Sequence, residues 1–159
     1  MSVKVVFLDY DGVINTPMWN EDGSRCRFGM PYDNKVNNFQ AVQWVSEFCQ
    51  KYSYSIVVTS TWRLDNNWKE CLINGGLRDG IAILGCTKCL EKRGQEINVW
   101  LNEHPEVKSY LIFDDETYDL TKEQKRRCVR TRDDIGFMRQ EFLAATRLHK
   151  SFNSDKQKS

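Results

Sequence analysis

The sequence predicts an α/β fold: a single Rossmann-like domain in which helices cover both faces of a central parallel sheet. Three observations lead to this prediction. The chain has 159 residues, the size of one ordinary domain. Short apolar segments rich in β-branched residues alternate with segments of helical periodicity. Polar residues follow several of the apolar segments directly, and parallel sheets bind ligands at those strand ends.

Five short apolar segments are expected to form the strands. Residues 3–8 (VKVVFL) are too few for a helix and nearly apolar on both faces, which is typical of a central parallel strand. Three further segments have the same character, and a fifth has it more weakly. These four are residues 55–58 (SIVV), 81–84 (IAIL), 110–113 (YLIF) and 128–130 (CVR).

Two helices are expected between these strands. In each, apolar residues recur at the spacing that places them on one helix face, where they can pack against the sheet. The first helix follows the first strand, and the second precedes the fourth strand. Their apolar residues are Ala41, Val45, Phe48 and Tyr52 in the first helix, and Ile97, Trp100 and Leu101 in the second.

A last helix is expected after the fifth strand. Residues 131–134 (TRDD) fit a capping box with Asp in place of Glu, which predicts that the helix begins there. Residues 149–159 carry one apolar side chain among charged and polar ones, so we expect a disordered tail after a domain of residues 1–148. The apolar stripe of the helix would consist of Ile135, Met138, Phe142 and Ala145.

Composition and charge exclude several classes of protein. The apolar fraction of 40% and the aromatic fraction of 12% exclude a disordered or fibrous chain. The 23 Lys and Arg residues balance 22 Asp and Glu residues, so the sequence is neither a strongly basic nucleic-acid binder nor an acidic scaffold. No apolar run approaches the roughly 18–20 residues that span a bilayer, and no secretion signal is evident. We therefore expect a soluble, cytoplasmic protein.

The six cysteines are expected to be free thiols. Disulfide frameworks belong to small secreted domains, and this sequence has neither a signal segment nor a shortage of apolar residues. Cys86 and Cys89 have the spacing of half a zinc site, but no second pair or histidine pair accompanies them.

Polar side chains follow three of the predicted strands. The first strand runs into Asp9, Asp11 and Gly12, and two acids converging at one sheet edge suit a divalent metal. Taken alone, this DxDG segment is also a common turn. The other strand ends favour the metal site, because the second strand runs into Thr59 and Ser60 and the fourth into Asp114 and Asp115.

These segments resemble the signatures of the haloacid dehalogenase-like (HAD) hydrolase superfamily. VVFLDYDGVIN is similar to the first signature, IVVTS to the second, and IFDD to the acidic fourth, and they occur in order along the chain. A basic residue between the last two would be the third signature. More narrowly, TSTWR, KRGQEINVWL and IFDDETYD resemble a small branch of the superfamily, described as a domain of multifunctional RNA repair proteins.

The resemblance implies a Mg²⁺-dependent phosphatase. Asp9 would be the nucleophile that forms an aspartyl-phosphate, and Asp11 would protonate the leaving oxygen and later activate water. Asp9, the backbone carbonyl of Asp11 and Asp114 would hold Mg²⁺, with Asp115 as a further candidate ligand. Gly12 is expected in the substrate-binding loop.

The phosphate-binding residues implied by the resemblance leave alternatives open. Either Thr59 or Ser60 would supply the hydroxyl of the second signature. Lys92 and Arg93 compete for the cation of the third signature, as does Lys88, and each would otherwise be a surface residue. A further cation, Arg63, could reach a substrate phosphate with its planar fork or could brace Asp115. The residues in question are Thr59, Ser60, Lys88, Lys92, Arg93 and Arg63.

The connections between the signatures are too short for a large cap domain. Capless relatives act on bulky phosphates, so the resemblance implies a nucleotide or polynucleotide end as substrate. Residues 15–32 could form a short flap that contacts a nucleotide, or their aromatic residues could simply pack against the domain. The residues concerned are Trp19, Arg25, Arg27, Phe28 and Tyr32.

Two features leave room for other functions. Residues 122–132 contain six basic residues and one acid, which fits either a modest phosphate-binding patch or a solvated helix face. The domain could also be a catalytically idle HAD domain that binds a nucleic-acid end or a protein partner. The four intact signatures favour the enzyme.

Overall fold

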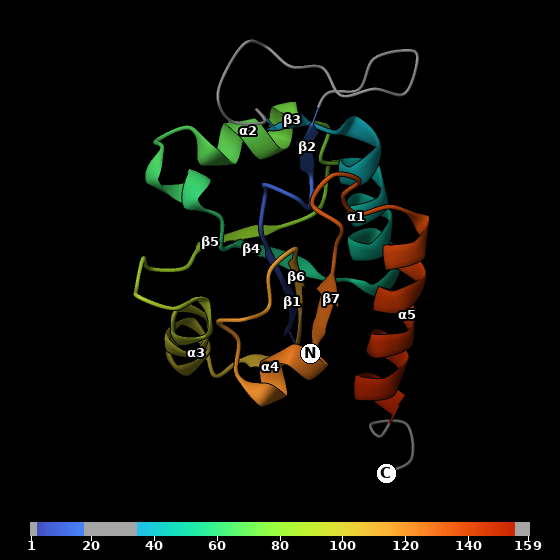
Figure 1. Cartoon of the computed structure of the whole chain (residues 1–159). Coiled ribbons are helices and arrows are strands. Elements are labelled where there is room, and N and C mark those ends of the chain that lie inside the picture. Colours follow the sequence, from blue (N-terminus) through green and yellow to red (C-terminus); the bar gives the residue numbers. More distant parts are fainter. Residues whose placement is uncertain (1–2, 18–34, 155–159) are drawn as a thin grey trace.

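A five-stranded sheet forms the centre of the structure, a computed structural model that describes residues 3–17 and 35–154 (Figure 1). All pairings in the sheet are parallel, and the strand order is β5-β4-β1-β6-β7. The predicted α/β architecture is therefore confirmed. The strands are β1 (Val3–Leu8), β4 (Ser55–Val58), β5 (Ile83–Cys86), β6 (Val107–Asp114) and β7 (Cys128–Arg130).

Helices cover both faces of the sheet. Helices α1 (Phe39–Tyr52) and α5 (Arg139–Asn153) pack on one face, and α3 (Arg93–Glu103) packs on the other (Figure 1). Helix α1 is well delimited, because the Asn38 side chain accepts a hydrogen bond from the Ala41 amide and Ser53 ends it in the left-handed conformation. The smaller elements are η1, a 3₁₀ helix (Thr61–Leu64), α2 (Trp68–Asn74) and α4 (Lys122–Arg126).

The core is divided by the sheet into two clusters of buried residues. On the α1 and α5 side, Phe48 and Phe113 are buried completely, in edge contact with each other. On the α3 side, Phe7 packs edge-on against Trp100. Burying a large apolar side chain contributes about 1.5–3 kcal/mol, so both clusters hold the helices to the sheet.

Three predicted element boundaries are wrong. The fourth strand was expected at residues 110–113, but β6 is longer, from Val107 to Asp114. The third strand was expected at residues 81–84, but β5 is Ile83–Cys86, because Gly85 and Cys86 pair with Val57 and Val58 of β4. Helix α5 begins at Arg139, not near residue 131. The Thr131 hydroxyl, expected to cap the helix, donates instead to the carbonyl of Gly12 at 2.6 Å.

The C-terminal helix extends further than expected. Residues 149–153 belong to α5, so the prediction of a disordered tail from residue 149 is wrong for them. His149 forms a hydrogen bond with the Tyr54 hydroxyl at 2.9 Å, and its ring lies 4.3 Å from the ring of Tyr52. These contacts hold the last turns of α5 against the end of α1. Residues 155–159 lie outside the described part.

A two-stranded antiparallel pair lies beside the main sheet. It consists of β2 (Asn15–Pro17) and β3 (Lys35–Asn37). The expected flap residues Trp19, Arg25, Arg27, Phe28 and Tyr32 lie outside the described residues. Within residues 3–17 and 35–154, the connections between strands hold short elements and no separate cap domain.

Two further expectations concern membranes and thiols. No helix among the described residues is long and apolar enough to cross a bilayer. Cys86 and Cys89 are free thiols, as are the other cysteines for which the structure gives a position.

Candidate active site

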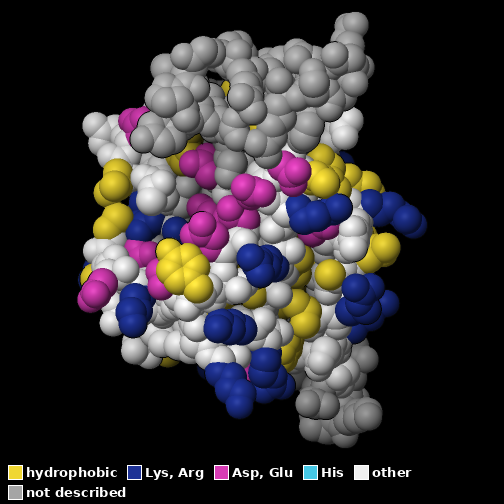
Figure 2. All heavy atoms as spheres, in the orientation of Figure 1, with side chains coloured by type: hydrophobic (Ala, Val, Ile, Leu, Met, Phe, Trp, Pro, Cys, Tyr) yellow, Lys and Arg dark blue, Asp and Glu magenta, His cyan; other side chains and the backbone are white. Residues whose placement is uncertain are grey.

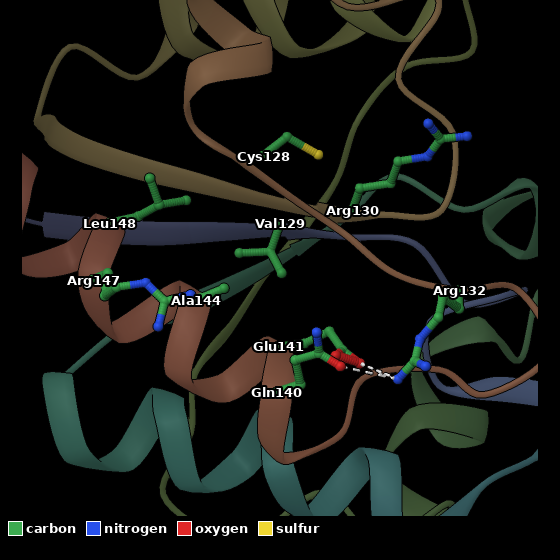
Figure 3. A pocket seen from close by; sticks show the side chains of 9 residues that line it. All are labelled: Cys128, Val129, Arg130, Arg132, Gln140, Glu141, Ala144, Arg147 and Leu148. Atoms are coloured by element: carbon green, nitrogen blue, oxygen red, sulfur yellow. Dashed lines mark hydrogen bonds and ion pairs between the residues drawn. The ribbon is translucent and has the colours of Figure 1, made fainter.

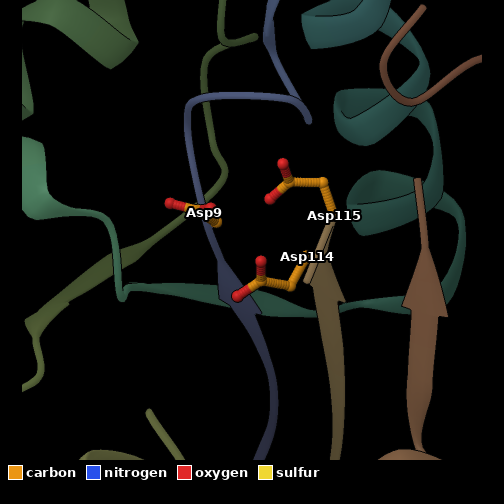
Figure 4. A group of neighbouring side chains, drawn as sticks. All are labelled: Asp9, Asp114 and Asp115. Atoms are coloured by element: carbon orange, nitrogen blue, oxygen red, sulfur yellow. The ribbon is translucent and has the colours of Figure 1, made fainter. Parts of the chain in front are cut away.

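The carboxylates of Asp9, Asp114 and Asp115 meet at the ends of the two central strands. Strands β1 and β6 are neighbours whose last paired residues are Leu8 and Phe113, so the next residues along each strand are brought together. One oxygen from each of the three carboxylates lies within 4.8 Å of the other two (Figure 4). Carboxylate oxygens are the hard ligands that Mg²⁺ prefers, so this donor set suits the metal.

Burial disfavours the charged forms of the carboxylates in this acidic cluster. Burial raises the pKa of Asp9, and the nearby Asp115 charge raises it further, while the Arg93 guanidinium opposes both effects. Burial and the Asp9 charge raise the pKa of Asp114 in the same way. A divalent cation would stabilise the charged forms of these carboxylates, which is the electrostatic signature expected of a metal site.

Arg93 is the basic residue that reaches the acidic cluster. Its guanidinium lies 3.3 Å from a carboxylate oxygen of Asp114 and 3.8 Å from one of Asp9. Lys92 precedes α3, and its side chain is exposed, without an ion pair in the described part of the chain. Lys88 pairs with Glu103 on the surface at 2.9 Å. Of the three candidates, the geometry therefore favours Arg93.

A buried glutamate, Glu96, orients two arginines beside the cluster. It lies one turn into α3 and receives Arg93 Nε at 3.3 Å. Arg63 also forms an ion pair with Glu96, and both side chains are about 5% exposed or less. Arg63 further donates to the Ser60 carbonyl at 2.7 Å and to the Thr59 carbonyl. Arg63 thus connects the end of β4 to Glu96 of α3. Its partner among the acids is Glu96, and not Asp115.

Thr59 and Ser60 differ in what their hydroxyls do. Ser60 caps η1, because its Oγ accepts a hydrogen bond from the Trp62 amide at 3.2 Å. The Thr59 side chain is fully buried, and its hydroxyl has no hydrogen-bond partner. Buried hydroxyls are normally paired, so the unpaired hydroxyl of Thr59 is unusual, whereas that of Ser60 is already used.

Asp11 is held by side chains outside the acidic cluster. Its Oδ1 accepts hydrogen bonds from Trp62 Nε1 at 3.0 Å and from Asn15 Nδ2 at 3.2 Å. These two donors fix the direction of the carboxylate.

Gly12 lies where no side chain would fit. Its φ angle is +83°, and a Cβ atom would stand 2.4 Å from a carboxylate oxygen of Asp115. Its carbonyl accepts the hydroxyl of Thr131, which follows β7. Gly12 therefore lets the loop after β1 press against the acidic cluster.

A pocket of about 260 Å³ opens at this edge of the sheet. Its lining includes Asp9, Asp114 and Arg93, together with Arg63 and Glu96. Its outer lining adds the acids Glu91, Glu116 and Asp119 and the exposed ring of Tyr118.

Sequence reasoning missed three residues of this site. Glu96 carries a weak signal, because it stands three residues after Arg93 and one helical turn brings such a pair together. Trp62 and Asn15 carry none, because their bonds to Asp11 depend on how η1 and the loop after β1 pack.

The comparison with protein families agrees with this geometry. A family model described as the HAD domain in Swiss Army Knife RNA repair proteins matches residues 5–142. The match includes the acidic cluster, four strands of the central sheet in full and β1 from Val5 onward. No curated protein matches the chain. The chain thus belongs to the family of HAD domains found in Swiss Army Knife RNA repair proteins, as the resemblance of its motifs predicted.

Proposed function

We propose that this protein is a phosphomonoester hydrolase that requires Mg²⁺ and acts through a phosphorylated Asp9. The observation that carries the proposal is the meeting of three carboxylates, two of them buried, with one arginine and one unpaired hydroxyl at a single edge of the sheet. Each of these groups has a task in phosphoryl transfer, and none is required by the packing of the core.

The chain's own residues supply the steps of the reaction. The Asp9 carboxylate forms a bond to phosphorus as the ester P–O bond breaks, and Asp11 gives its proton to the departing oxygen. Asp11 then takes a proton from water, whose oxygen attacks the phosphorus and frees Asp9 and inorganic phosphate. Trp62 and Asn15 aim Asp11 at that position through their hydrogen bonds.

Arg93 and Thr59 would bind the transferred phosphoryl group. Both offer donors to its equatorial oxygens, where negative charge is held in the transition state. The ion pair with Glu96 holds the Arg93 guanidinium in place. Mg²⁺, held by Asp9, Asp114 and Asp115 together with the Asp11 carbonyl, would neutralise the repulsion between the carboxylate and the phosphate.

The proposed substrate is a nucleotide or a polynucleotide end. The family to which the chain belongs occurs in RNA repair proteins, which supports a nucleic-acid phosphate. No separate cap domain covers the pocket in the described part of the chain, which is compatible with a bulky substrate.

Turnover of an aryl phosphate with and without Mg²⁺ tests the reaction class. We expect Mg²⁺-dependent release of the phenol by the wild-type protein and none by Asp9→Asn. A matched control is Asp79→Asn, which makes the same chemical change at an exposed position outside the site and should behave as wild type.

The covalent intermediate is tested directly. Acid-quenched protein treated with borohydride should carry a reduced residue at position 9, found by peptide mass spectrometry. Turnover that survives Asp9→Asn would reject the mechanism. No turnover in any protein, with retained binding of a phosphorylated nucleic-acid end, would instead support the idle binding domain.

A further inference from the structure

A second pocket lies between β7 and α5, outside the candidate active site. Its volume is about 440 Å³ (Figure 3). Strand β7 ends the order of the sheet, so its outer edge pairs with no described strand. The residues that carry charge in this pocket, here called the arginine groove, are Arg130, Arg132, Arg147 and Glu141.

The arginine groove is positively charged after its internal ion pair is counted. Glu141 is buried and lies 3.8 Å from Arg132, so this pair is neutral. Arg132 also donates to Gln140 at 3.3 Å, which directs the guanidinium across the mouth of the groove. Arg130 and Arg147 are exposed and have no ion-pair partner in the described part of the chain.

The charges of the groove are spread along its length. In Figure 3, Arg130 and Arg132 lie toward one end and Arg147, on α5, toward the other. A ligand with a single anionic group would meet one end only. A chain with repeated anionic groups would meet both.

The groove begins one strand away from the acidic cluster. Arg130 is the register partner of Asp114 on the neighbouring strand, and adjacent strands lie about 4.8 Å apart. The Arg130 Nε donates to the carbonyl of Asp115 at 3.2 Å, and the Thr131 amide donates to the carbonyl of Asp114 at 3.1 Å. The two sites are therefore connected through the backbone that carries the candidate metal ligands.

The acidic part of the active-site pocket lining would repel a polyanion. Glu91 precedes α3, and Glu116 and Asp119 lie between β6 and α4. Figure 2 shows acidic side chains gathered in the middle of the face, and basic side chains over its lower and right-hand parts, where Figure 1 places α4, β7 and α5. On this face, the basic side chains over β7 and α5 give a negatively charged chain a favourable direction away from the acidic side chains.

We propose that the arginine groove binds the phosphate backbone of a polynucleotide whose terminal phosphate occupies the active site. The proposal rests on the proposed function and adds to it a second binding site and a path for the strand. Arginine is suited to this task because its planar fork binds phosphate through two parallel hydrogen bonds.

Substrate length tests the proposal in activity. A single-stranded oligoribonucleotide of about a dozen residues with a terminal phosphate is compared with an aryl phosphate, which is too small to reach the groove. For Arg147→Gln we expect the loss of kcat/KM on the oligonucleotide to exceed the loss on the aryl phosphate by roughly fivefold or more. Arg126→Gln removes the same charge from α4, outside the groove, and should match wild type on both substrates.

Equilibrium binding separates this proposal from the catalytic one. Asp9→Asn protein, which cannot turn over, is titrated with the same labelled oligonucleotide at several salt concentrations. Each phosphate contact to a single strand contributes about 0.7 to the slope of log K against log salt, so adding Arg147→Gln should lower the slope by about that amount. A slope and affinity unchanged by Arg147→Gln would overturn the groove proposal, even if aryl phosphate is hydrolysed.

A peptide is the competing occupant of the groove. An exposed strand edge can bind an extended peptide, so a phosphopeptide of equal length is titrated in parallel. Tighter binding of the phosphopeptide, or equal sensitivity of both ligands to Arg147→Gln, would reject the polynucleotide. Salt-sensitive preference for the oligonucleotide, weakened by Arg147→Gln and retained in Arg126→Gln, supports it.

Discussion

The two faces of the central sheet differ in how much apolar surface they bury and in whether they carry charged residues. The face under α1 and α5 buries the larger apolar cluster, in which Phe48 alone contacts the rings of Phe113, Phe142 and Tyr54. The face under α3 buries a smaller cluster. Beyond it lie the buried charges of the candidate active site. The face under α1 and α5 therefore contributes most of the apolar packing. The face under α3 packs fewer apolar residues and also carries the charged residues of the candidate active site.

The alternation of side chains along the strands explains why the chemistry lies on the α3 side. Phe7, Val57 and Ile112 all point into the cluster under α3. Two residues further along each strand stand Asp9, Thr59 and Asp114, and side chains two residues apart share a face of the sheet. The polar residues that follow these three parallel strands therefore lie on the face of the sheet covered by α3, the helix that carries Arg93 and Glu96.

Among variants that keep the Asp9 nucleophile, the largest effect is expected on the catalytic side, for Asp11→Asn. General acid or base groups contribute about 10²–10⁴-fold, so turnover of esters with poor leaving groups should fall by that factor. An asparagine oxygen can still accept the bonds from Trp62 and Asn15, so the local structure should persist. Acidic phenols need no proton and should suffer less. Steady-state kinetics on a series of aryl phosphates measures this, and equal losses across the series would contradict the acid role.

A large effect on stability is expected for Phe48→Ala on the opposite face. Removing a buried phenylalanine costs about 3–5 kcal/mol, and the free energy of unfolding by urea should fall by that amount. The folded fraction should keep its kcat within about twofold, because Phe48 touches no residue of the site. A change in the leaving-group dependence of Phe48→Ala would show that the two faces are not separable.

The strands illustrate what could be predicted from sequence. Strands β1, β4 and β7 begin and end as predicted, because their β-branched and apolar residues differ sharply from their neighbours. The position of β5 could not be predicted, because Gly85 has no strand propensity of its own and belongs to the strand only through its pairing with Val57. The start of α5 was missed because a capping pattern does not reveal that Thr131 bonds to Gly12, more than a hundred residues away.

The candidate site was predictable for a related reason. Asp9, Asp114 and Asp115 could be found because parallel strand ends must meet. The choice of Arg93 over Lys92 could not be made, because it depends on where α3 begins and which side chain turns inward. Tertiary contacts of this kind, like that of Trp62 with Asp11, have no local pattern.

A smaller effect is expected for Trp62→Phe, which keeps the aromatic ring and removes the donor to Asp11. Asn15 still holds the carboxylate, so we expect a loss of roughly tenfold, well below that of Asp11→Asn. If Trp62 acts through Asp11, the loss should be greatest for poor leaving groups, as in Asp11→Asn. A uniform loss across the aryl phosphate series would assign Trp62 a structural role only. Trp44→Phe, on the α1 side, is the matched control and should show neither effect.

The last prediction concerns the pH dependence of stability without metal. The folded protein holds the pKa of Asp9 at about 6 and that of Asp114 at about 8, mainly because both are buried. The folded state therefore binds more protons than the unfolded chain, so this contribution is present at low pH and is lost as pH rises through these values. In EDTA the Tm of the wild-type protein should therefore fall as the pH is raised from 5 to 8.5.

Two comparisons make the pH prediction specific to the acidic cluster. Asp114→Asn removes one of the charges that burial and Asp9 oppose, so in EDTA the Tm of this variant should decline less above pH 6 than that of the wild type. Mg²⁺ favours the deprotonated carboxylates, so its addition should raise the wild-type Tm more at pH 8.5 than at pH 5 and should do less for Asp114→Asn. Thermal unfolding followed by circular dichroism measures both differences. Parallel Tm curves for the two proteins, with no greater effect of Mg²⁺ at high pH, would contradict the prediction. They would mean that the charged carboxylates of Asp9 and Asp114 do not destabilise the folded protein.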